Sequence, residues 1–286
     1  MSKKLHALVA KSLSMILLGT TSIAQEEAVS DEVIVEQRAA LAASTEGAGF
    51  GPQSPRDIDA IAGKNDRTFG AAPSYTKMNL CNIHFHENAE HRGGEFTTYA
   101  GNGNGEGVGT GFRYDGELTE AELTPIGTPI GVSEEGDLEP GDTIEVHFVF
   151  STAGIEPGPT LGACMSDAIG NPQLRVETQV IVLVNDDEAM DFTEMGRVEM
   201  VDGYFQAPGL PSDMGTPVVY AGSTTGPSYN EVGSPFQVTW SVRPHVARVD
   251  IHSVGEWLSD NVFEEAHAHG VRNLVDNLAL LSPIAQ

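Results

Sequence analysis

CNIHFHENAEH, residues 81–91, is the stretch from which the fold and the candidate site of this 286-residue chain can be built. Successive side chains of an extended strand point to opposite faces, so His84 and His86 share one face while Ile83 and Phe85 share the other. The stretch therefore predicts a β-strand that buries its apolar side chains and presents two imidazoles on the opposite face.

The segment IEVHFVF, residues 144–150, continues this pattern, because Glu145 and His147 share a face. If the two strands pair, three imidazoles meet beside a carboxylate. Three nitrogen ligands and one open position describe a catalytic zinc site, whereas a closed structural site takes four protein ligands. We predict that His84, His86 and His147 bind one Zn²⁺. The alternative is a histidine pair without a metal, which is common where H-x-H stands alone.

The composition bounds the class of protein. Hydrophobic residues make up 40% of the chain, as in an ordinary globular core. Acidic residues outnumber basic ones by 41 to 15, which gives a net charge of -26. Phosphate groups need a basic surface, so we expect no nucleic-acid partner and no anionic membrane partner. The simplest role of the charge is a solvated acidic shell.

The N-terminal part indicates export. Residues 1–24 resemble a signal peptide, with lysines before the apolar run 13–19 and the small residues Ser22 and Ala24 at the cleavage positions. This run is too short to span a membrane, and we expect no stable membrane span after the signal is removed. We expect an acidic leader at 25–50, one catalytic domain at 51–286, and a periplasmic or secreted location.

The chain has two cysteines, Cys81 and Cys164. In an oxidising compartment they can form one disulfide that fastens the histidine strand to a later segment. The alternative is two buried free thiols. The sequence leaves both open.

Short apolar runs between clusters of Gly, Pro, Asn and Asp dominate from residue 77 onward and predict a mainly β fold. We expect a single domain with a largely antiparallel central sheet and peripheral short helices. The weakly helical stretch 31–43 is interpreted as a linker or an N-terminal helix. Further helices are expected from an N-cap at Ser253 to about Phe263 and around 271–281. The strands are expected at 77–86, 94–100, 143–151, 174–185, 198–206, 218–220 and 236–243.

The glycine-rich run GNGNGEGVGTG, residues 101–111, could pass for a phosphate-binding loop. It precedes no helical run and lacks the Lys-Ser/Thr pair of a nucleotide-binding loop. We therefore interpret it as a hairpin connection.

Four separated segments together resemble the carbonic anhydrases, most closely the delta class and behind it the alpha class. The resemblance spans about residues 51–243 and rests on motifs in the same order, at 53–59, 84–91, 145–149 and 220–240. It implies an alpha-carbonic-anhydrase-like fold and the reversible hydration of carbon dioxide to bicarbonate and a proton, by attack of a zinc-bound hydroxide.

The resemblance also implies roles for residues around the zinc ligands. Thr225 would accept a hydrogen bond from the hydroxide and pass its own proton toward Glu90, and a one-residue slip would give Thr224 this role. Glu145 would accept the ring proton of a ligand histidine and orient it, and His91 and Tyr220 would join the same buried hydrogen-bond network. Val149 and Trp240 would form the dry wall that holds carbon dioxide.

Two other functions remain alternatives. A cupin-type enzyme would use His84, His86, Glu90 and His147 to bind iron or manganese, so a metal-bound Glu90 would favour it. A non-catalytic exported metal-binding domain is the third reading. His267 and His269 could bind a second metal but are more typical of packing near a helix end, and we expect His245 and His252 to be structural.

Overall fold

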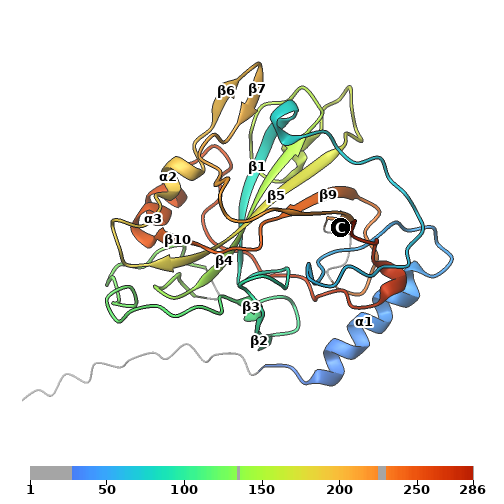
Figure 1. Cartoon of the computed structure of the whole chain (residues 1–286), viewed down its shortest axis with the longest axis horizontal. Coiled ribbons are helices and arrows are strands. Elements are labelled where there is room, and N and C mark those ends of the chain that lie inside the picture. Colours follow the sequence, from blue (N-terminus) through green and yellow to red (C-terminus); the bar gives the residue numbers. More distant parts are fainter. Residues whose placement is uncertain (1–27, 134–135, 225–229, 286) are drawn as a thin grey trace, which may run out of the picture.

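One mixed sheet forms the centre of the protein (Figure 1), whose computed structural model describes residues 28–133, 136–224 and 230–285. The strand order is β1-β4-β5-β9-β8, and β10 also pairs with β5. The strands of this sheet are β1 (Asn79–Glu87), β4 (Thr143–Ser151), β5 (Leu174–Val184), β8 (Val218–Ser223), β9 (Gln237–Val242) and β10 (Ala247–Asp250).

The mainly β prediction is confirmed, and the sheet is more mixed than expected. β1 with β4, β4 with β5, and β8 with β9 are antiparallel. β9 and β10 both run parallel to β5, along the first and the last part of its 11 residues. Parallel pairs are made by long crossover connections, and period-two patterning carries no information about strand direction.

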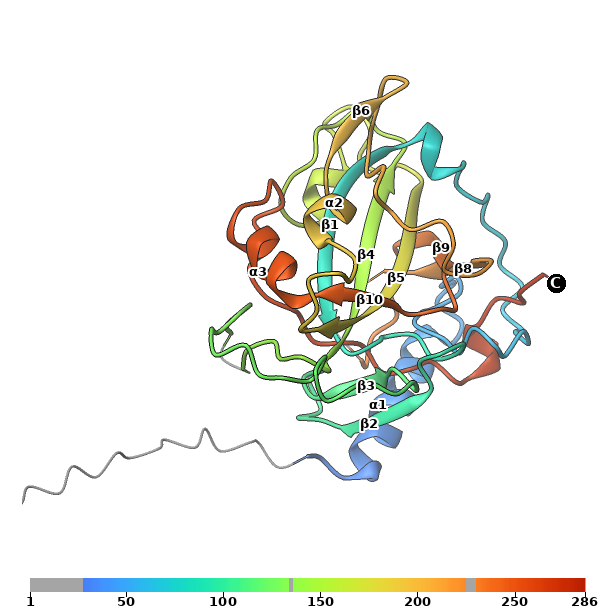
Figure 2. The same cartoon turned by 60° about the vertical axis from the view of Figure 1, so that its left-hand side comes forward.

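The sheet separates an apolar core from the face that carries the histidines. Ile83, Phe85 and Phe148 are fully buried in the larger core cluster. Two helices, α2 (Phe192–Met195) and α3 (Ile251–Ser259), lie together on one side of the sheet (Figures 1 and 2) and add Phe192 and Trp257 to this core. The alternation read from the sequence therefore sorts apolar side chains to one face of β1.

Two small hairpins lie outside the central sheet. β2 (Thr98–Asn102) pairs with β3 (Thr110–Arg113), and the glycine-rich run connects them, which confirms its interpretation as a hairpin connection. β6 (Glu199–Val201) pairs with β7 (Tyr204–Gln206) through Asp202 and Gly203, both at positive φ, as a tight two-residue turn requires. The predicted strand 198–206 is thus a hairpin.

The predicted N-terminal helix is confirmed as α1 (Asp31–Thr45). Its Leu41 packs in a small cluster with Val275, Leu280 and Leu281. Gln37 donates a hydrogen bond from Nε2 to the carbonyl of Gly105, 2.8 Å away, which docks α1 beside the β2–β3 hairpin (Figure 2).

Two helix predictions near the C-terminus were wrong in detail. Helix α3 begins at Ile251 with Asp250 as its N-cap, because Ser253 is already engaged by the N–H of Phe192. The segment 271–281 contains only the 3₁₀ helix η3 (Leu278–Leu280), since the N–H of Val275 donates to the Pro55 carbonyl instead of to its own turn. Two other 3₁₀ helices are η1 (Tyr75–Lys77) and η2 (Leu161–Cys164).

The predicted signal peptide, residues 1–24, lies outside the described residues. Within the part of the chain that the structure describes, no helix has both the length and the apolar character needed to cross a membrane.

Candidate metal centre

Pairing of β1 with β4 brings three histidines together. His84 lies directly opposite His147, and His86 lies opposite Glu145. The ring centroids of His86 and His147 are 4.5 Å apart, and those of His84 and His147 are 5.0 Å apart. One nitrogen from each of the three rings falls within 4.8 Å of the other two, which makes them a group that could hold a metal ion.

Each of these rings donates its outer N–H to a protein oxygen. His84 donates from Nδ1 to Asn82 Oδ1 at 2.6 Å, and His86 donates from Nδ1 to the Gly270 carbonyl at 2.9 Å. His147 donates from Nε2 to Glu145 Oε1 at 2.6 Å. These acceptors fix the tautomers, so the lone pairs of His84 Nε2, His86 Nε2 and His147 Nδ1 remain for a ligand.

The same geometry fits a bound divalent metal. His147 Nδ1 lies 3.2 Å from His84 Nε2. Two lone-pair nitrogens that approach this closely favour a cation between them. Three neutral imidazoles are a donor set that zinc accepts, with one coordination position left for a small molecule. The residues present therefore fit a catalytic zinc ion.

Burial disfavours the charged forms of His84 and His86. Burial, followed by the nearby charge of His147 and His86, lowers the pKa of His84 well below its ordinary value of 6.5. Burial and the charge of His147 also lower the pKa of His86. Protons therefore compete little with a metal for these nitrogens near neutral pH.

A buried chain of polar groups extends behind His147. His91 approaches Glu145 Oε1 with its Nδ1 at 2.7 Å and donates its backbone N–H to Oε2 at 3.0 Å. His91 Nε2 is 2.7 Å from the Tyr220 hydroxyl, which in turn lies 3.2 Å from Ser54 Oγ. Burial would raise the pKa of Glu145, but the charge of His91 and the hydrogen bonds from both histidines hold it well below its usual value.

Glu90 is buried beside the three histidines but is not one of the candidate ligands. Its Oε2 is 3.9 Å from His147 Nε2, the nitrogen that faces away from the other two rings. Its Oε1 accepts the backbone N–H of Arg272 at 3.2 Å. Among the described residues, two groups could hold a metal ion, the three histidines and a second group of His91, Glu145 and His147, and Glu90 belongs to neither. This placement counts against the cupin-type alternative.

A pocket opens onto the three histidines and has an apolar wall. Val149, Trp240 and Thr224 line this pocket. Trp240 is oriented by a hydrogen bond from Nε1 to the Ser223 carbonyl at 3.1 Å. Thr225, the predicted gatekeeper, lies outside the described residues.

Sequence reasoning missed several residues of this pocket. Val176 on β5 and Val238 on β9 line it, and period-two alternation within those strands could have identified both. Leu161 and Arg272 also line it. They lie on irregular segments whose place is set by tertiary contacts, so no local pattern marks them.

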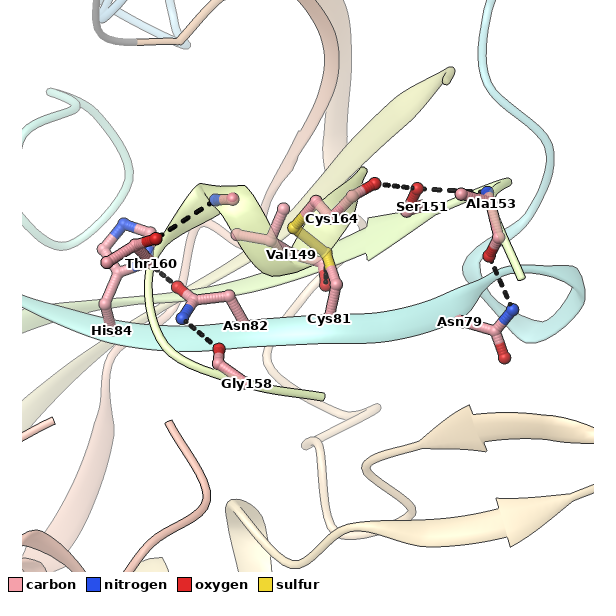
Figure 3. Close-up of a disulfide and its surroundings, with 11 residues drawn as sticks. Asn79, Cys81, Asn82, His84, Val149, Ser151, Ala153, Gly158, Thr160 and Cys164 are labelled. Carbon is pink, nitrogen blue, oxygen red and sulfur yellow. Dashed lines mark hydrogen bonds between the residues drawn. A yellow bond between two sulfur atoms is a disulfide. The ribbon is translucent and has the colours of Figure 1, made fainter. Parts of the chain in front are cut away.

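Cys81 and Cys164 form a disulfide, with Cα atoms 5.0 Å apart (Figure 3). Both residues are fully buried. The sequence left open a disulfide or two free thiols, and the structure contains the disulfide. It joins β1 to the C-terminal end of η2.

His269 lies near the centre but is held differently. Its backbone pairs with β1 beside His86, and its imidazole lies 3.0 Å from Glu265 Oε1. Within the described parts of the chain, neither His269 nor His267 belongs to a group of potential metal ligands. The backbone of His269 therefore lies along the edge of β1.

A β-sheet face with three convergent imidazole nitrogens beside an apolar pocket is the arrangement expected of a metal-dependent enzyme that acts on a small substrate. A family model described as Delta carbonic anhydrase matches residues 75–253, and the chain belongs to this family. The protein is thus a carbonic anhydrase, as the resemblance implied. The match includes β1, β4 and the strand that carries Tyr220.

Several solved carbonic anhydrases are similar to the chain. An alpha-carbonic anhydrase of Photobacterium profundum has 15% identity and a TM-score of 0.30, over 87% of this chain and 96% of that one. A halotolerant carbonic anhydrase from Dunaliella salina has 16% identity and a TM-score of 0.31, over 84% and 86% of the two chains. These values are low, and the family assignment rests on the sequence match. No curated protein matched the chain.

Proposed function

We propose that this carbonic anhydrase hydrates carbon dioxide reversibly with one Zn²⁺ held by His84, His86 and His147. The observation that carries the proposal is the tautomer pattern, in which three outer N–H groups are hydrogen-bonded and three inner nitrogens converge. Zinc with an open position supplies a hydroxide nucleophile from water near neutral pH. The remaining steps belong to the side chains around it.

The apolar wall holds the substrate. Carbon dioxide carries no strong hydrogen-bonding group. Val149, Val176 and Trp240 offer it an apolar surface, against which water makes few hydrogen bonds. All three side chains are at least nine-tenths buried. The wall therefore places the substrate carbon beside the histidines and limits competition from water.

Glu145 holds His147 in its ligand orientation. The carboxylate receives hydrogen bonds from His147 and His91, and the His91–Tyr220 contact closes the chain behind it. An ionised Glu145 also makes the His147 imidazole a stronger electron donor. Its low pKa keeps it ionised throughout the neutral range.

Glu90 and Thr225 orient the nucleophile in this proposal. Glu90 lies in the same pocket as Thr224, the described residue that precedes Thr225. A threonine hydroxyl that donates to a carboxylate must itself accept the proton of the attacking oxygen, which directs that oxygen's lone pair toward the substrate.

Stopped-flow hydration of carbon dioxide tests the proposal. The zinc-loaded protein should be active, chelator treatment should abolish activity, and added Zn²⁺ should restore it. His147→Ala should abolish zinc retention, whereas His252→Ala, at an exposed position on α3, should leave zinc and activity unchanged. Full activity after complete zinc removal would refute the mechanism.

We also propose that the protein is exported, to a periplasm or to the outside. The signal-like residues 1–24 and the disulfide support this location, because disulfides persist in oxidising compartments. Fusion of residues 1–24 to a phosphatase that is active only after export tests it. An inactive fusion would count against export.

A further inference from the structure

Asn82 connects the metal centre to a separate segment of the chain (Figure 3). Its Oδ1 accepts from His84 Nδ1 at 2.6 Å, and its Nδ2 donates to the Gly158 carbonyl at 3.1 Å. The side chain is buried and has its two polar atoms engaged on opposite sides. The orientation of the His84 ring therefore depends on where residue 158 lies.

Segment 158–164 is fastened to the sheet near both of its ends. The Gly158 N–H donates to the Cys81 carbonyl at 3.0 Å. At the other end, Cys164 is bonded to Cys81, and its carbonyl accepts from Ser151 Oγ at 2.6 Å. The disulfide is the covalent fastening between this segment and β1.

The segment also contains a residue in a costly conformation. Thr160 has φ 60° and ψ 170°, a backbone region otherwise used almost only by glycine. Such a conformation persists only where surrounding contacts hold it in place. The disulfide at Cys164 is the covalent link that holds this segment against β1, and its loss would let the segment relax.

Between its two fastened ends the segment reaches the pocket. Leu161, the first residue of η2, lines the pocket with Val149 and Trp240. The disulfide therefore holds the segment that contains both Gly158, the partner of Asn82, and Leu161, a part of the pocket wall.

We propose that the Cys81–Cys164 disulfide is a positioning element of the metal centre, acting on His84 through Gly158 and Asn82. The inference rests on the proposed function, because it takes His84 as a zinc ligand. Removing the disulfide frees the Gly158 carbonyl, loosens Asn82 and lets the His84 ring turn. Zinc release should then be faster, although neither cysteine belongs to a group of potential ligands among the described residues.

A double-mutant cycle on zinc release tests the route. The variants are Cys81→Ala/Cys164→Ala, Asn82→Ala and the combination of the two. The readout is the rate at which zinc-loaded protein releases zinc to a chromophoric chelator. Loss of an outer contact of a ligand histidine typically costs about 10-fold to 100-fold in metal affinity. We expect release about tenfold faster in each parent variant, and no faster in the combined variant than in the faster parent.

Two controls separate positioning from a general loss of stability. Val254 is a fully buried position on α3 in the larger core cluster, away from Gly158 and Asn82. Val254→Ala should lower stability without changing a contact of either residue. It should leave the release rate within about twofold of wild type at a temperature far below its melting point. If the cysteine variant does not fold, wild type and Asn82→Ala reduced with a water-soluble phosphine supply the same comparison.

The outcomes are distinct. Unchanged release from a folded, disulfide-free protein overturns the inference, as does a combined variant whose effect is the product of the two parent effects. Equal acceleration in Val254→Ala overturns it too. A wild-type protein that retains no zinc refutes the proposed function itself, whereas zinc-loaded wild type with any of the three earlier results refutes this inference alone.

Discussion

His147 Nε2 and His91 Nδ1 both contact the same oxygen of Glu145, at 2.6 and 2.7 Å. One buried carboxylate oxygen thus serves two imidazoles, and only one of the two rings faces the other candidate ligands. The arrangement makes Glu145 the point at which the orientation of His147 is decided. It also makes this carboxylate the most sensitive position of the centre outside the three ligands.

Glu145→Gln should weaken zinc binding by about 10-fold to 100-fold. An amide of the same shape can keep its oxygen toward both imidazoles only by turning its N–H₂ group toward the backbone N–H of His91, and the flipped amide turns the N–H₂ group toward both imidazoles. In either orientation two donors face each other. A buried donor is then left without an acceptor, so thermal stability should fall. Zinc competition with a chelator of known affinity measures the first effect, and thermal unfolding measures the second.

The control for this change is Glu188→Gln, at an exposed position after β5. It removes the same charge from the protein without touching the centre. Equal zinc affinity in the two variants would show that Glu145 does not orient His147.

The strand alternation identified the three histidines and Glu145 because each strand's own geometry fixes which side chains share a face. It could not identify the Gly270 carbonyl that accepts from His86, since every residue has a carbonyl and only tertiary structure brings this one to the ring. The same limit applies to Asn82, whose contact with His84 follows from the strand face, but whose contact with Gly158 does not.

The start of α3 shows a different limit. Asp250 and Ser253 are both good N-cap residues, and the sequence alone does not rank them. The structure uses Asp250, whose carboxylate accepts the His252 N–H, while the Ser253 hydroxyl accepts the Phe192 N–H from α2. The start of α3 therefore depends on Phe192, a residue 61 positions away from Ser253 in the sequence.

Zinc retention should persist well below pH 6.5. The pKa of His84 is lowered by burial, so this nitrogen takes up a proton only at more acidic pH. In the zinc-free protein, the unfolded chain binds this proton at higher pH than the folded chain does. The free energy of unfolding of that form should therefore fall as the pH drops below 6.5.

Zinc content after gel filtration at a series of pH values from 7.5 to 4.5 measures the first effect, and denaturant unfolding of the zinc-free protein over the same range measures the second. Half-loss of zinc already between about pH 7 and 6.5 would contradict the predicted pKa direction.

Val149→Phe should block the pocket without displacing the metal. Val149 is buried in the wall beside the histidines, and a larger ring there occupies the space that the substrate needs. The expected result is a loss of at least about tenfold in kcat/KM for hydration, with one zinc retained per chain. Val219→Phe, an equal change at an exposed position on β8, should leave kcat/KM unchanged. Unaltered kcat/KM in Val149→Phe would mean that carbon dioxide binds elsewhere.

Asp142→Asn should stabilise the protein at alkaline pH and not at acidic pH. Burial, followed by the neighbouring charges of Glu87 and Glu139, raises the pKa of Asp142 from 3.8 to about 6. The folded chain therefore holds this proton more tightly than the unfolded chain does, so the ionised carboxylate costs stability above pH 6, and the cost is relieved as the pH falls through 6. Asparagine keeps an oxygen for the Glu139 N–H and carries no charge.

The expected gain at pH 8 is on the order of 1–3 kcal/mol, since each unit of pKa corresponds to about 1.4 kcal/mol. Urea unfolding of the two proteins at pH 8 and at pH 4.5 measures it, and the difference between them should shrink at the lower pH. The control is Asp187→Asn, which removes an equal charge from an exposed position and should shift stability by less than about 0.5 kcal/mol at either pH. A gain of the same size at both pH values would show that asparagine acts through packing and not through the charge of Asp142.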